Sequence, residues 1–86
     1  MEKEPKWNAL KSERLKKVRG VSFEDILKAR YMGTEKHPNR EHQRLMLFEY
    51  KGQVWVVPYV ENEKELFFKT LYPSRKHTKL YRKGEL

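Results

Sequence analysis

The stretch that decides the fold is Arg44 to Tyr72, RLMLFEYKGQVWVVPYVENEKELFFKTLY, because it holds three apolar runs of strand length separated by short polar links. The runs predict strands over residues 44–50, 54–60 and 65–72. The links, residues 51–52 and 61–64, are short enough to require antiparallel neighbours. The middle run is apolar on both alternating faces, so its strand should be central in the sheet. Pro58 should weaken the pairing there, because proline cannot donate to a sheet ladder.

The last of these strands carries a lysine on an apolar side. Alternation of side chains along residues 65–72 predicts that one face holds Leu66, Phe68, Thr70 and Tyr72, and the other Phe67, Lys69 and Leu71. An inward Lys69 would be desolvated and shifted toward a usable base, unless its long stem carries the ammonium group to the sheet edge, which is the commoner outcome. Glu49 in the same sheet could form a general-base pair with Lys69, but an ordinary cross-strand ion pair is the expected arrangement.

Capping signals predict three helices around these strands. Asn8 can cap a helix over residues 9–19 that ends at Gly20. Ser22 with Asp25 approximates a capping box, and the apolar spacing after it predicts a helix through Tyr31 that ends at Gly33. Ser74 can cap a last helix that ends near Gly84.

The polar segment 34–43, interrupted by Pro38, is expected to be a mobile connection whose ends may form a short edge strand. Together these elements predict an α+β fold with two N-terminal helices, an antiparallel sheet of three to four strands, and one C-terminal helix. The helices should cover one face of the sheet.

Length and composition indicate one small domain. The 86 residues, 37% of them hydrophobic, can close a single core, so we expect one domain over residues 1–86 with a folded part at 7–83 and a disordered tail at 1–6. The chain has no cysteine, which excludes a disulfide framework and a thiolate zinc site. No stretch approaches the roughly 18 apolar residues of a membrane span, so we expect no membrane partner, and the cytoplasm is the expected location.

The charge of the chain points to an anionic partner. Twenty Lys and Arg residues against twelve Asp and Glu residues give a net charge of +8, and residues 69–83 contain six basic residues and no acid. Phosphate is the expected counterpart: nucleic acid is the first candidate partner, an anionic membrane surface the second, and an acidic protein partner remains open. The candidate nucleic-acid-binding residues lie in the first and last predicted helices: Lys16, Lys17, Arg19, Arg75, Lys79 and Arg82.

Four short motifs follow one another from Trp7 to Tyr81. They are Trp7-Asn8 before a basic helix, residues 19–25 (RGVSFED), an apolar hairpin, and residues 73–78 (PSRKHT) opening the last helix. In this order and spacing they resemble the BrnT-type toxins of bacterial type II toxin-antitoxin modules. The resemblance implies a small metal-independent ribonuclease toxin with a RelE-like fold and no cofactor, which cleaves RNA and inhibits translation. It also implies a co-encoded antitoxin with a ribbon-helix-helix DNA-binding domain, and binding of operator DNA only through the toxin-antitoxin complex.

One position departs from the family pattern. Val18-Arg19 stands where members of the family often have Lys-His before the glycine, so no histidine role transfers to this site. Arg19 can hold a phosphate, but a guanidinium group does not deprotonate and cannot shuttle a proton.

A metal-free ribonuclease must deprotonate a ribose 2′-hydroxyl, stabilise the phosphorane charge and protonate the leaving 5′-oxygen. Arg75 and Lys76, in the first turn of a helix, can clamp the phosphate, although a solvated helix face is an equal reading. The candidate catalytic residues are Lys69, Lys76, His77 and Tyr81. His77 points away from Arg75 and Lys76 on the helix, and Tyr81 is the right spacing to share its face, where packing is the simpler role.

Other residues have a structural reading that comes first. His37 and His42 lack the carboxylates of a metal site, so loop decoration is expected and no metal is predicted. The aromatic residues of the strands could stack on bases but are expected to form the core. Two other functions fit the charge: a non-catalytic nucleic-acid-binding module, and a basic subunit that docks an acidic protein.

Overall fold

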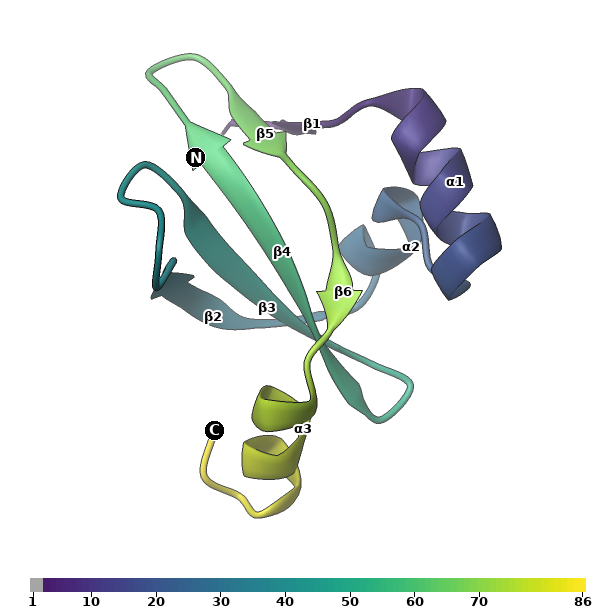
Figure 1. Cartoon of the computed structure of the whole chain (residues 1–86), viewed down its shortest axis with the longest axis vertical. Helices are drawn as coiled ribbons and strands as arrows, with labels where there is room; N and C mark the ends of the chain where they lie inside the picture. Colours follow the sequence, from purple (N-terminus) through teal and green to yellow (C-terminus); the bar gives the residue numbers. More distant parts are fainter. Residues whose placement is uncertain (1–2) are drawn as a thin grey trace.

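The computed structural model describes residues 3–86, which form one mixed sheet and three helices (Figure 1). In chain order the elements are β1 (Pro5–Lys6), α1 (Ala9–Arg19), α2 (Phe23–Leu27), β2 (Arg30–Lys36), β3 (Arg44–Tyr50), β4 (Gln53–Glu61), β5 (Leu66–Phe68), β6 (Tyr72–Pro73) and α3 (Arg75–Arg82). The strand order is β1-β5-β4-β3-β2, and β6 pairs with β4 beyond the end of β5. β1 runs parallel to β5, and the other pairs are antiparallel.

The predicted layout of two helices, an antiparallel sheet of three to four strands and a last helix is therefore wrong in its sheet. The α+β composition with three helices is present, but the sheet has six strands and mixed direction. β4 is central, as its two apolar faces predicted.

The N-terminal segment supplies one of the missed strands. The sequence predicts a disordered tail over residues 1–6, yet Pro5 and Lys6 form β1, while Met1 and Glu2 lie outside the described residues. Two ion pairs to the acidic end of the β4–β5 connection accompany this pairing: Lys3 to Glu61 at 2.9 Å and Lys6 to Glu65 at 3.3 Å. A strand of two residues is too short to show an alternating pattern of side chains, and its partner lies about 60 positions away, so the sequence near it does not predict it.

The second helix is shorter than its apolar spacing predicted, because β2 takes its last residues. α2 begins with the expected capping box but ends at Leu27, and Tyr31 lies in β2, its ring 5.6 Å from that of Phe48. Gly33 does not end a helix. It lies at a register shift between β2 and β3 with φ of 144°, a backbone conformation that favours glycine.

The predicted strand over residues 65–72 is broken by a bulge opposite Pro58. Two residues of β4, 57–58, face three residues of the other strand, 69–71. Pro58 has no N–H to donate, and its carbonyl accepts the N–H of Lys69 at 2.8 Å. The extra residue reverses the alternation, so Leu71 packs on the same side as Leu66 and Phe68, and Tyr72 packs on the other.

Of the two outcomes considered for Lys69, burial as a base and exposure of its side chain, the structure shows the second, which was the commoner expectation. Lys69 is exposed at the bulge, and its Nζ lies 5.8 Å from the centre of the Phe67 ring. Its expected partner, Glu49, instead accepts the backbone N–H of Gly52 at 3.0 Å.

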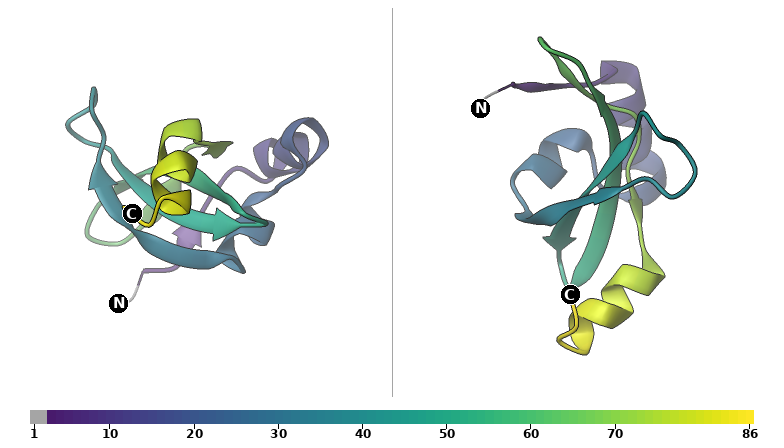
Figure 2. Two further views of the ribbon diagram at one scale, coloured as in Figure 1. Left: turned by 90° about the horizontal axis from the view of Figure 1, so that it is seen from below. Right: turned by 90° about the vertical axis from the view of Figure 1, so that its left-hand side faces the viewer.

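The sheet has an apolar cluster on each face, and the helices are divided between them (Figure 2). One cluster holds Leu15 of α1 and Phe23 and Ile26 of α2 against Trp55 and Phe68. The other is smaller: Leu45, Leu47, Val54 and Val56 are buried, with Met32, Tyr72 and Tyr81 of α3 packed against them. The expectation that all helices cover one face is wrong, since α3 packs on the opposite side from α1 and α2.

Within residues 3–86, the structure has no helix with the length and apolar character needed to cross a bilayer.

Candidate nucleic-acid interface

The last helix, α3, is hydrogen-bonded to the first residues of β4 through its backbone and through one buried side chain. Ser74 caps the helix by accepting the N–H of His77 at 3.2 Å, and its own N–H donates to the carbonyl of Val54 at 2.9 Å. The N–H of Val54 donates to the hydroxyl of Thr78 at 2.9 Å in a buried contact. At the other end, Arg82 donates to the carbonyl of Gly52 at 3.3 Å. These bonds fix the orientation of α3.

The fixed helix has two chemically different sides. With about 3.6 residues per turn, five basic residues fall within roughly a third of the circumference, and we call them the basic arc: Arg75, Lys76, Lys79, Arg82 and Lys83, the last being the helix C-cap. All five are exposed. The opposite side carries His77 and Tyr81, which are half-buried against the sheet, and the buried Thr78 lies between the two sides.

The basic arc borders a surface groove. Gln53, Pro73, Ser74, Thr78 and Leu80 also line it, and no acidic residue does. In the part of the chain that the structure describes, the ion pairs involve Lys3, Lys6, Lys16 and His77, and none involves the basic arc. The acidic β4–β5 connection lies at the other end of the molecule (Figure 1). The basic arc can therefore receive an anionic ligand without first breaking an ion pair.

The four predicted catalytic residues do not meet in one place. Lys76 lies on the basic arc, His77 and Tyr81 lie on the sheet-facing side of the same helix, and Lys69 lies at the bulge. Tyr81 packs against the apolar cluster of that sheet face. A chemical role for each remains a prediction.

The candidate residues of the first helix lie away from α3 in Figure 1 and are partly engaged elsewhere. Lys16 pairs with Asp25 at 2.7 Å, and the guanidinium of Arg19 donates to the carbonyl of Leu71. Lys17 is exposed. Of these three cations, Lys17 is the one whose side chain makes no hydrogen bond or ion pair among residues 3–86.

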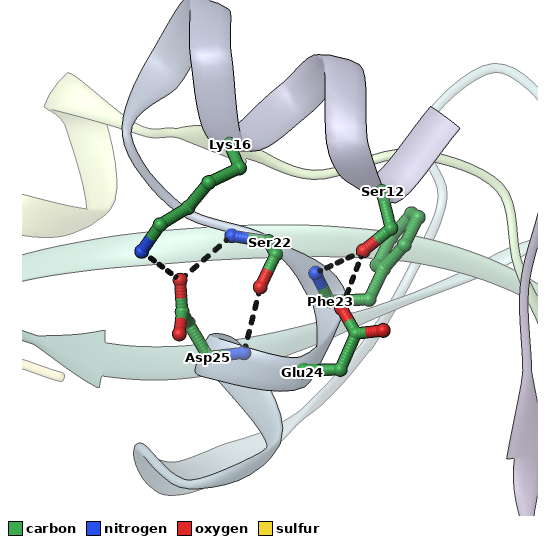
Figure 3. Close-up of polar contacts among 6 residues, drawn as sticks. All are labelled: Ser12, Lys16, Ser22, Phe23, Glu24 and Asp25. Carbon is green, nitrogen blue, oxygen red and sulfur yellow. Dashed lines mark hydrogen bonds and ion pairs between the residues drawn. The ribbon is translucent and has the colours of Figure 1, made fainter. Parts of the chain in front are cut away.

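Figure 3 shows that hydrogen bonds join α1 to the segment that follows it, which includes α2. Ser12 donates to Glu24 at 2.6 Å and accepts the N–H of Phe23 at 3.0 Å. Ser22 and Asp25 form the reciprocal capping box. The hydrogen bond from Ser12 lowers the pKa of Glu24.

The ion pair with Lys16 has a larger effect. The hydrogen bond from Lys16, followed by that from the Ser22 backbone, lowers the pKa of Asp25 from 3.8 to about 2, and the same contact raises the pKa of Lys16. The residues that carry the resemblance at 19–25 therefore hold the two helices together.

One polar constellation was missed in the sequence. The Nδ1 atom of His77 lies 2.7 Å from the hydroxyl of Ser74, and its Nε2 atom lies 3.0 Å from the carboxylate of Glu35 on β2. The His77 side chain is 12% exposed and that of Glu35 43%. No local signal could have joined these residues, because Glu35 lies 42 positions earlier, in a segment expected to be a loop.

His37 lies in the connection between β2 and β3, as its expected role in a loop predicted. His37 accepts the N–H of Asn39 at 3.1 Å within the β2–β3 turn. Among residues 3–86 no group of three or more His, Cys, Asp or Glu side chains could hold a metal ion.

Comparison with protein families, with curated proteins and with solved structures gives no match for this chain. The resemblance to BrnT-type toxins therefore remains a prediction.

Proposed function

We propose that the protein is a metal-independent endoribonuclease of the toxin type, with its RNA-binding site on α3. The observation that supports this best is the basic arc: five cations on one side of a helix, beside a groove without acidic residues. A single-stranded RNA backbone carries the phosphates that such a side of a helix can neutralise.

The N-terminus of α3 adds donors to these charges. Ser74 caps the N–H of His77, which leaves the first two backbone N–H groups of the helix, those of Arg75 and Lys76, free of an intrahelical acceptor. Such groups favour an anion, and the helix dipole has the same sign. A phosphate held here would contact two side-chain cations and two amides, which is an arrangement suited to stabilising phosphorane charge.

The partners follow from the resemblance and are part of the proposal. An antitoxin with a ribbon-helix-helix domain would neutralise the toxin, and operator DNA would be bound through their complex. Cleavage of RNA during translation places the proposed activity in the cytoplasm.

The test is an RNA-cleavage time course with purified protein in excess EDTA at low salt, comparing wild type with Lys76→Ala. We expect cleavage that survives chelation and falls at least about tenfold in the variant, since removing one stabilising donor costs about this much or more. Lys64→Ala, in the acidic connection at the other end of the molecule, is the control for loss of one positive charge.

A parallel reaction in a translating extract tests the ribosome-dependent form of the same activity. Absence of cleavage in both reactions, or equal cleavage by wild type and Lys76→Ala, contradicts the proposal.

A non-catalytic nucleic-acid-binding module is the second candidate, and one observation favours it. The proton-transfer candidates His77 and Tyr81 do not line the groove, whereas all five cations of the basic arc do. This reading predicts salt-dependent binding of RNA without cleavage.

A further inference from the structure

The contact between β2 and α3 is a chain of three side chains. The hydroxyl of Ser74, the imidazole of His77 and the carboxylate of Glu35 lie in series, with 2.7 Å from Ser74 Oγ to Nδ1 and 3.0 Å from Nε2 to Glu35. We propose that this chain is a proton relay that opens into the basic groove at Ser74, with Glu35 as the residue that positions His77. The proposal rests on the ribonuclease function argued above.

Glu35 determines which ring nitrogen carries the proton. An ionised carboxylate can only accept a hydrogen bond, so the contact with Glu35 requires a proton on Nε2. In the neutral ring Nδ1 is then an acceptor, and the hydroxyl of Ser74 must donate to it. A carboxylate that fixes the tautomer and then stabilises the imidazolium has the role of the acid in a Ser-His-Asp triad.

Ser74 is where the relay meets the ligand site. It lines the groove beside Arg75 and Lys76, whereas His77 lies behind it and does not line the groove. A serine hydroxyl has one donor and two acceptor lone pairs. The donor is used on Nδ1 and one lone pair on the N–H of His77, which leaves one lone pair for a group in the groove.

That remaining lone pair can accept the proton of a ribose 2′-hydroxyl. In the step we infer, the 2′-oxygen bonds to phosphorus and its proton passes to Ser74, while Ser74 gives its own proton to Nδ1 of His77. The bond from phosphorus to the 5′-oxygen breaks, and the 5′-oxygen takes a proton from water in the groove. The products are a 2′,3′-cyclic phosphate and a 5′-hydroxyl, and the imidazolium beside Glu35 later releases its proton to solvent.

A purely structural helix cap explains less of this geometry. Capping requires the bond from the His77 N–H to Ser74 Oγ, but not an imidazole on that same oxygen nor a carboxylate behind the imidazole. The two parts of the relay come from different elements, which the sheet register and the bonds of α3 to β4 bring together.

The first test needs no activity. Nitrogen-15 NMR of the intact protein distinguishes the two neutral tautomers of His77, and we expect the Nε2–H form to predominate. Glu35→Ala should convert it to a mixture, while Glu41→Ala, in the neighbouring turn, should not. Predominance of the Nδ1–H form in the wild type, or no change in Glu35→Ala, overturns the relay.

The second test is kinetic, on the RNA cleaved by the wild type, with folding of each variant checked by circular dichroism. Ser74→Asn keeps a good helix cap but has no hydroxyl to pass a proton, so kcat should fall by about 100-fold with KM within about twofold. Ser74→Thr keeps the hydroxyl and should restore most of the rate.

Equal kcat for Ser74→Asn and wild type overturns the relay. If the wild type cleaves no RNA, the proposed function fails, whereas the tautomer of His77 still decides whether Glu35 positions the ring.

Discussion

The basic arc predicts how RNA binding depends on salt. The side chains of four of its cations make no hydrogen bond to the protein within residues 3–86: Arg75, Lys76, Lys79 and Lys83. If each neutralises one phosphate of a single strand, the slope of log K against log salt is about −0.7 per contact, or about −2.8 in all. Binding should then weaken by about 50-fold between roughly 50 and 200 mM salt.

The double variant Arg75→Ala/Lys76→Ala should halve that slope to about −1.4, so that the same change in salt weakens binding by only about sevenfold. Fluorescence anisotropy with a labelled single-stranded RNA measures the slope directly. The matched control is Lys28→Ala/Lys64→Ala, which removes two exposed charges outside α3. An unchanged slope in the first variant, or an equal loss in the control, would refute the assignment of the phosphate site to α3.

Two further predictions concern the contacts that hold the helices in place. The lowered pKa of Asp25, from 3.8 to about 2, means that its charge stabilises the fold above pH 4 and loses this effect as the pH falls toward 2. The full shift corresponds to about 2.4 kcal/mol, which screening of the surface pair with Lys16 should reduce to about 1 kcal/mol. Urea unfolding of Asp25→Asn should show this loss at pH 7 and only a small part of it near pH 2, where about half of the folded molecules still carry the charge. A loss that is constant with pH would contradict this prediction. Thr78→Val leaves the buried N–H of Val54 without an acceptor and should cost about 1–3 kcal/mol in the same assay, with a smaller cost for Thr78→Ser; a valine variant as stable as wild type would show that this bond contributes nothing.

Local signals in the sequence predicted the helix starts and the central hairpin. Asn8, Ser22 and Ser74 cap the three helices as their side-chain chemistry indicated, and Ser22 forms the predicted capping box with Asp25. The strands of the central hairpin, β3 and β4, begin and end within one residue of the predicted ranges. Caps and hairpins are decided by neighbours in the chain, so a single sequence contains the information.

The missed strands depend on distant partners instead. β1 pairs with β5 some 60 positions away, and β2 takes residues whose spacing also fits a helix face. The candidate site divides in the same way. The basic arc follows from helical periodicity and could be read from residues 75–83, whereas the contact of Glu35 with His77 requires the position of β2 beside α3.

The bulge at Pro58 affects both the position of the basic arc and the contact of Glu35 with His77. Without an N–H at residue 58, a regular ladder cannot continue from β5 to β6, and the opposing strand takes one extra residue there. One extra residue moves every later side chain to the other face of the sheet. Tyr72 thus packs on the face opposite Leu66 and Phe68, and the chain enters α3 on that side. The proline therefore helps to determine that His77 meets Glu35 and that the basic arc faces solvent on the side of the sheet away from α1 and α2.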